Sequence, residues 1–126
     1  MSKVKYIGEY EFNASKKMLY PYLNSASGLS RWFADDVNIN ADKEFIFLWD
    51  GEESRARITT SRLNEQVKFK FVSEDEDPNY VEFKLEKNEL TGSVYLEVTD
   101  YSEMDEDEAS ELWSSLVHDL KEIVGG

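Results

Sequence analysis

The chain has 126 residues, of which 40% are hydrophobic, so it is long enough for one domain with its own core and too short for two. Its 27 acidic and 14 basic residues give a net charge of −13. This charge argues against nucleic-acid and membrane-surface partners, because phosphates and anionic headgroups are bound by Lys and Arg. We therefore expect one strongly anionic domain over residues 1–126.

Cysteine is absent, which excludes disulfides, thiolate nucleophiles and thiolate metal ligands. The first residues contain no apolar stretch typical of a secretory signal, and no later stretch approaches the length of a membrane span. These features predict a cytoplasmic protein.

Alternation of apolar and charged residues over 5–12 predicts a half-buried first strand with Ile7 as the exception. Asn13 or Ser15 can then cap a short helix, which Pro21 should kink or shorten because proline lacks a backbone donor. A second short helical segment is expected over 28–33. It places three apolar residues on one side at helical spacing, namely Leu29, Trp32 and Phe33.

The middle of the chain predicts a series of short strands joined by turns. Asp50-Gly51 predicts a type I′ hairpin, and the acidic stretch 73–79, which contains Pro78, predicts an exposed loop. The strand over 44–49 is apolar on both faces, so we expect it inside the sheet or under a helix. The expected strands are residues 35–40, 44–49, 56–63, 67–71, 81–86 and 94–98.

The end of the chain predicts one long amphipathic helix, whose wide apolar stripe must cover the strands. Asp105 followed by Glu108 is typical of a capping-box start, and Gly125-Gly126 is typical of a helix end. We expect Trp113 and Leu116 to face the sheet. The full stripe is Ala109, Leu112, Trp113, Leu116, Val117, Leu120, Ile123 and Val124.

This order of elements is typical of an α+β helix-grip fold. Such a fold has a curved antiparallel sheet of about six or seven strands, two short helices after the first strand and a long C-terminal helix packed on the sheet. The residues add a resemblance that covers nearly the whole chain. Segments 28–37, 47–51, 90–92, 96–101 and 112–121 resemble those of START-like domains related to the activator of the heat-shock-protein-90 ATPase, in the birch-pollen-allergen-like (SRPBCC) superfamily.

The resemblance implies a pocket between the sheet and the last helix. The superfamily includes lipid and hormone carriers, polyketide cyclases, oxygenase ligand-binding domains and chaperone activators, and it shares no catalytic motif, so no catalytic residue is assigned. The cavity candidates are the large apolar residues expected on the inner surface: Trp32, Phe33, Phe45, Phe47, Trp49, Phe69, Phe71, Phe83, Leu96, Trp113 and Leu116. The alternative is that these side chains simply fill the core.

Polar candidates have simpler explanations. Alternation places Arg55 and Arg57 on the outside, and neither they nor Tyr80 and Tyr95 are assigned as ligand contacts. His118 is the only histidine and is interpreted as a helix-edge residue, since zinc needs three or four ligands.

The remaining acidic pairs suggest no metal or catalytic site. Asp75 with Asp77, and Asp105 with Asp107, lack the glycine and the distal glutamate of an EF-hand. Asp35-Asp36 is interpreted as a cap or strand entry. No metal and no cofactor is therefore expected.

The first functional hypothesis is a noncatalytic START-like module that binds a small hydrophobic or amphipathic ligand. The first alternative is an acidic interaction module, similar to the chaperone activators, that meets a basic protein partner. The second alternative is a cyclase-like enzyme, which would need an ionisable group facing the pocket.

Overall fold

The computed structural model describes residues 2–126, and Met1, the first residue of the expected 1–126 domain, lies outside the described residues. One antiparallel sheet of seven strands has the spatial order β1-β7-β6-β5-β4-β3-β2. The strands are β1 (Val4–Phe12), β2 (Asp36–Ile39), β3 (Phe45–Trp49), β4 (Glu52–Arg62), β5 (Gln66–Phe71), β6 (Tyr80–Lys87) and β7 (Val94–Ser102). The helices are α1 (Lys16–Leu19), α2 (Pro21–Asn24), α3 (Ala26–Leu29) and α4 (Glu106–Val124).

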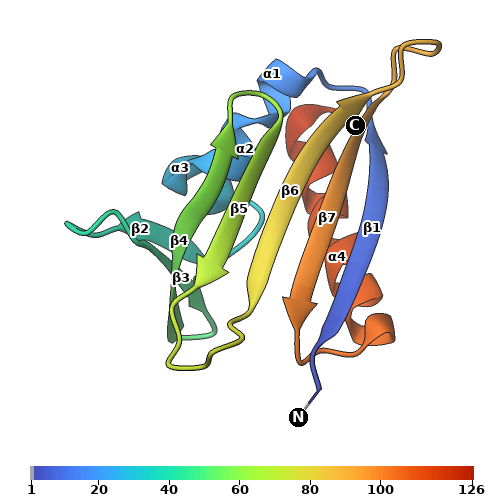
Figure 1. The fold of residues 1–126 in the computed structure, drawn as a ribbon. Helices are drawn as coiled ribbons and strands as arrows, with labels where there is room; N and C mark the ends of the chain where they lie inside the picture. Colours follow the sequence, from blue (N-terminus) through green and yellow to red (C-terminus); the bar gives the residue numbers. More distant parts are fainter. Residues whose placement is uncertain (1) are drawn as a thin grey trace.

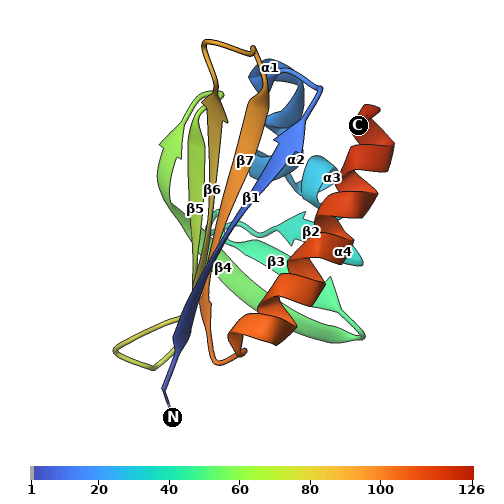
Figure 2. The same ribbon diagram turned by 90° about the vertical axis from the view of Figure 1, so that its right-hand side faces the viewer.

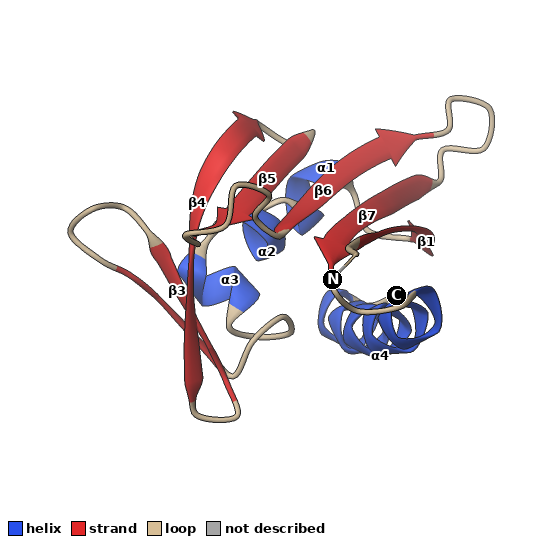
Figure 3. Ribbon diagram, turned by 60° about the horizontal axis from the view of Figure 1, so that its bottom comes forward, coloured by secondary structure: helices blue, strands red, loops and turns tan. Residues whose placement is uncertain are grey.

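All four helices lie on one side of the curved sheet (Figures 1 and 2). With the bottom of the molecule turned forward, the sheet curves around α3, and α4 lies below β7 and β1 (Figure 3). The chain crosses from β1 at one edge to β2 at the other through α1–α3 and then returns strand by strand. This is the predicted helix-grip architecture.

The hairpin between β3 and β4 is confirmed. Asp50 and Gly51 have φ values of 49° and 82°, and a type I′ turn requires positive φ at both central residues. The sheet order places β3 between β4 and β2, as its two apolar faces predict. Its inward residues Phe45 and Phe47 are buried.

The connection after β1 folds into three one-turn helices, where the sequence predicted two short ones. Ser15 caps α1 by accepting a 3.1 Å hydrogen bond from the Met18 backbone N–H. Pro21 begins α2, which separates that helix from α1 because proline has no backbone donor.

The predicted helix over 28–33 is wrong in its extent, because α3 ends at Leu29. Trp32 and Phe33 follow in a turn, where the Phe33 backbone N–H still donates to Leu29 O at 2.9 Å. This bond keeps the two aromatic side chains on the buried side, where the helical spacing had placed them.

Both predicted ends of α4 are confirmed. Asp105 Oδ1 accepts a 2.8 Å hydrogen bond from the Glu108 backbone N–H, and Gly125 ends the helix with a φ of 88°. The Gly126 carbonyl then accepts a 2.7 Å bond from the Asn13 backbone N–H, which fastens the end of α4 beside the end of β1.

Candidate functional site

The inward face of the sheet and the buried face of α4 supply the walls of the candidate site. Alternation along β7 points Leu96, Val98 and Asp100 inward, and the pairing register places Asp100 between Tyr6 of β1 and Val81 of β6. The helix α4, which packs on this face of the sheet, contributes Trp113, which is only 1% exposed.

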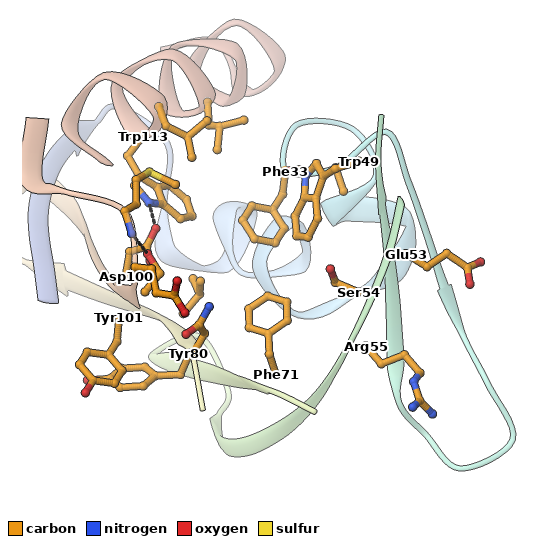
Figure 4. A pocket seen from close by; sticks show the side chains of 18 of the residues that line it. Phe33, Trp49, Glu53, Ser54, Arg55, Phe71, Tyr80, Asp100, Tyr101 and Trp113 are labelled. Carbon is orange, nitrogen blue, oxygen red and sulfur yellow. Dashed lines mark hydrogen bonds between the residues drawn. The ribbon is translucent and has the colours of Figure 1, made fainter. Parts of the chain in front are cut away.

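Beside this wall lies a cleft of about 1230 Å³. Figure 4 shows Trp113 and Asp100 on one side of it and Phe33, Trp49 and Phe71 on the other. The further apolar lining comes mainly from Trp32, Ala34, Val72, Val81, Met104, Leu112 and Leu116. The cleft is therefore an aromatic space between α4 and β3–β5.

The aromatic side chains next to the cleft are in mutual contact. Phe33 stacks on Trp113 with ring centroids 5.6 Å apart, and it meets Trp49 edge-on at 5.3 Å. Phe83, from the sheet, contacts Trp113 at 5.8 Å. Around Trp113, the helix therefore packs directly on the core, and the open space lies beside that core.

The eleven cavity candidates divide into two sets. Five of them, all on strands, lie in the buried core and do not line the large cleft: Phe45, Phe47, Phe69, Phe83 and Leu96. Phe45 also borders a smaller hollow near Ile39 and Arg57. The other six line the large cleft: Trp32, Phe33, Trp49, Phe71, Trp113 and Leu116.

Asp100 is the buried polar residue of the cleft, with 6% of its surface exposed. Its Oδ2 accepts a 2.7 Å hydrogen bond from Trp113 Nε1. A carboxylate removed from water is costly unless it is bonded, so this contact both anchors α4 and helps to hold the acid in place.

The polar candidates at the rim are placed differently. Tyr80 borders the cleft and stacks on Tyr101 at 5.2 Å, whereas Tyr95 does not line it. Arg55 also borders the cleft, but its guanidinium points away from Asp100 (Figure 4) and its side chain is 55% exposed.

Arg55 and Arg57 are joined through Glu44, which is 2% exposed. Glu44 Oε1 lies 3.3 Å from Arg55 Nη1 and Oε2 lies 2.9 Å from Arg57 Nη2. A hydrogen bond from the Asn40 amide, followed by the bond and charge of Arg57, lowers the pKa of the Glu44 carboxyl. This cluster ties the β2–β3 turn to β4.

The other polar residues have local partners. His118 Nε2 lies 3.1 Å from Glu122 Oε1 on the exposed side of α4. Asp35 Oδ2 accepts from the Asp50 backbone N–H at 2.9 Å, and Asp36 begins β2. Across residues 2–126, no group of three or more His, Asp or Glu side chains is arranged to hold a metal ion.

Asp100 was not among the predicted site residues, although the sequence contains a signal for it. It continues the inward series Val94, Leu96 and Val98, so an extension of that strand by two residues would have placed a carboxylate on the apolar face. Met104 and Leu112 were also missed as lining residues, and they enter the cleft only through the position of α4.

None of the helices in residues 2–126 combines the length and apolar character needed to cross a membrane. A comparison with curated proteins found no match to this sequence.

Several solved structures share the fold. The BfR322 protein from Bacteroides fragilis is 39% identical, with 98% of this chain and 92% of that chain covered and a TM-score of 0.65. The Aha1 dimer from Colwellia psychrerythraea is 18% identical over 96% of both chains, with a TM-score of 0.76. DynU16, a putative protein of the dynemicin biosynthetic locus, is 13% identical over 92% of this chain and 45% of that chain, with a TM-score of 0.71.

The model of the START-like superfamily domain matches residues 1–126 of this sequence. At these low identities, the TM-scores to Aha1 and DynU16 show a common fold alone, whereas the family model covers the whole sequence. The chain belongs to the START-like superfamily.

Proposed function

We propose that this protein is a noncatalytic binding module that holds a small hydrophobic or amphipathic molecule in the cleft between the sheet and α4. The observation that supports this most directly is the cleft of about 1230 Å³ with Phe33, Trp49, Phe71 and Trp113 around it. Binding sites for small molecules are typically concave and apolar, with a few polar groups that fix orientation.

The lining of the cleft offers two kinds of contact to such a molecule. Aromatic rings make up much of it, and charged and amide side chains, including Arg55, Asn79 and Asp100, line it as well. Leu112 on α4 is 40% exposed and lines the same space, so a bound apolar chain would remove it from water. The arrangement suits a ligand with an apolar body and one polar group.

The test is a titration with octanol, followed by tryptophan fluorescence and by the amide shifts of ¹⁵N-labelled protein. All three tryptophans, Trp32, Trp49 and Trp113, line the cleft, so their emission should change as it fills. Shifts confined to cleft residues support the proposal. Octanol that leaves both signals unchanged up to its solubility limit would contradict it.

A blocked variant makes the test specific. Ser54 lies on the inward side of β4, opposite Phe47, and lines the cleft, so Ser54→Phe should fill part of the space and weaken octanol binding. The matched control is Thr59→Phe, which adds the same side chain to an exposed position of β4 outside the cleft. Equal binding by both variants would place the ligand elsewhere.

A second candidate function, an interaction module for a basic partner, is favoured by the position of the two acidic stretches. The β5–β6 loop with its acidic residues at 74–77 and the start of α4 lie at the same end of the sheet (Figure 1). Charge collected on one end of a protein speeds and orients encounters with an oppositely charged partner.

Binding of a lysine-rich peptide at low and high salt tests this second function. Two triple Glu→Gln variants compare the acidic end with the rest of the surface at equal net charge. The end variant changes Glu74, Glu76 and Glu103, and the control variant changes Glu9, Glu11 and Glu86. Salt-sensitive binding that only the end variant loses supports the module, and equal losses would indicate general attraction to an anionic protein.

A further inference from the structure

Only one of the two oxygens of the Asp100 carboxylate accepts a hydrogen bond from the described residues. Oδ2 accepts the bond from Trp113 Nε1, whereas Oδ1 makes no hydrogen bond to any residue in the range 2–126. The residue is 6% exposed and lines the cleft, so a ligand in the cleft can offer a donor to the free lone pairs of Oδ1. A ligand donor is the kind of group that such an oxygen accepts.

The three cationic residues at the rim of the cleft have other partners. Lys3 Nζ lies 3.8 Å from Asp75 and also donates to the Asp77 carbonyl. Arg55 pairs with Glu44 at 3.3 Å, and Arg31 lies over the Tyr22 ring at 5.8 Å. None of them forms an ion pair with Asp100 within the described chain, so the protein leaves this buried charge without a cation.

Charge at the rim adds to this imbalance. The cleft is lined by those three cationic residues and, besides Asp100, by five acidic ones. The five are Asp35, Glu53, Asp75, Glu103 and Asp119. The whole chain carries −13, which concentrates cations near its surface and repels anions. Aromatic faces around the cleft further favour a cation, since ring quadrupoles attract ammonium and guanidinium groups.

From these contacts we infer that the cleft selects cationic amphiphiles, whose ammonium group binds Asp100 Oδ1 while their apolar body lies against Phe33, Trp49 and Phe71. This inference rests on the proposed ligand-binding function and narrows its ligand class. It assigns Asp100 two tasks, which are to anchor Trp113 through one oxygen and to recognise the ligand charge through the other.

Three probes with the same eight-carbon chain test the inference on the unaltered protein: octylammonium, octanol and octanoate. Charge-assisted hydrogen bonds are roughly twice as strong as neutral ones, so octylammonium should bind about tenfold more tightly than octanol. Octanoate should bind more weakly than octanol, because its carboxylate and that of Asp100 carry the same charge. Added salt should reduce the advantage of octylammonium.

Asp100→Asn removes the negative charge of the site and keeps a side chain of nearly the same size and shape. The amide oxygen can still accept from Trp113 Nε1, so the anchoring bond can persist while the roughly tenfold preference for octylammonium over octanol disappears. The matched control, Glu89→Gln, removes one charge from an exposed turn outside the cleft and should keep the preference. The Trp113 Nε1–H resonance reports whether the anchoring bond persists.

The outcomes distinguish this inference from the function on which it rests. Octanol or octanoate binding as tightly as octylammonium to the unaltered protein overturns the charge selection and leaves the binding function intact. If none of the three probes binds, the binding function itself fails. If the Asp100→Asn variant still prefers octylammonium, another group recognises the ammonium, and the role of Asp100 is overturned. Because the three probes are first compared on the unaltered protein, a poorly folding variant would not prevent a decision.

Discussion

Trp113 Nε1 and Asp100 Oδ2 form a buried 2.7 Å hydrogen bond that joins α4 to the inward face of β7. The indole ring also packs against Phe33 and Phe83, so one side chain combines a polar anchor with aromatic packing. The closing helix of the grip is thereby attached at the point where the core ends and the cleft begins.

Trp113→Phe keeps an aromatic ring but removes the indole donor, which leaves Asp100 buried without this partner. We expect the free energy of unfolding to fall by about 2 kcal/mol, because a buried polar group loses its partner and the smaller phenyl ring packs less well. Urea denaturation measures the change. Ser115→Ala, at an exposed position of the same helix, should change it by less than about 0.5 kcal/mol. Equal effects of the two variants would contradict an anchoring role for Trp113.

Glu44 should make the free energy of unfolding depend on pH in the acid range. Its pKa lies below the usual value of 4.5 because Asn40 and Arg57 bond the ionised carboxylate. A lowered pKa in the folded state means that the stabilisation is complete above pH 4.5 and is lost as the pH falls through the lowered value. The difference in unfolding free energy between the unaltered protein and Glu44→Gln should therefore be largest near neutral pH and shrink in acid.

Chemical denaturation at a series of pH values measures this difference for Glu44→Gln. Glu89→Gln serves as the control for the loss of one negative charge, because Glu89 lies in an exposed turn. A Glu44→Gln curve parallel to that of the unaltered protein throughout the acid range would show that the Glu44 cluster does not stabilise the fold through its charge.

Gly28, the glycine of the helical connection, should not tolerate a larger residue. A Cβ at this position would lie 2.1 Å from the Pro21 carbonyl oxygen and 2.7 Å from Tyr22 Cα, both backbone atoms of α2. We expect Gly28→Ala to lower the free energy of unfolding by about 1–3 kcal/mol, because α3 must move away from α2. Thermal unfolding with exposed Ser27→Ala as the control checks this, and a Gly28→Ala protein as stable as the control would disprove the close packing.

Gly51 tests the hairpin that the sequence predicted. Its φ of 82° is unfavourable for most residues with a Cβ, although no atom would obstruct an added methyl group. Gly51→Ala should therefore cost about 1 kcal/mol through backbone strain alone. Gly51→Asn is the control, because asparagine tolerates positive φ and should be less destabilising. The two midpoints in urea give the comparison, and a Gly51→Ala midpoint at or above that of Gly51→Asn would contradict the strain.

Local patterns were sufficient for most of the fold. Alternation located the strands, Asp50-Gly51 located a hairpin, and Asp105 with Gly125 located the ends of α4, because each of these depends on residues within a few positions of one another. The error over 28–33 has a local cause as well. Leu29, Trp32 and Phe33 have helical spacing, but a tight turn with one bond to Leu29 O presents the same side chains inward.

The candidate site depended on contacts between distant segments. The order of residues is enough to show which side chains are apolar and which face of a strand or helix they occupy. It does not show that Phe47 and Phe83 are packed into the core while Trp49 and Phe71 border a cleft, because depth depends on strand order, sheet curvature and the position of α4. The same packing placed Trp113 over Asp100, and so turned an ordinary strand-end aspartate into a buried carboxylate beside an aromatic cleft.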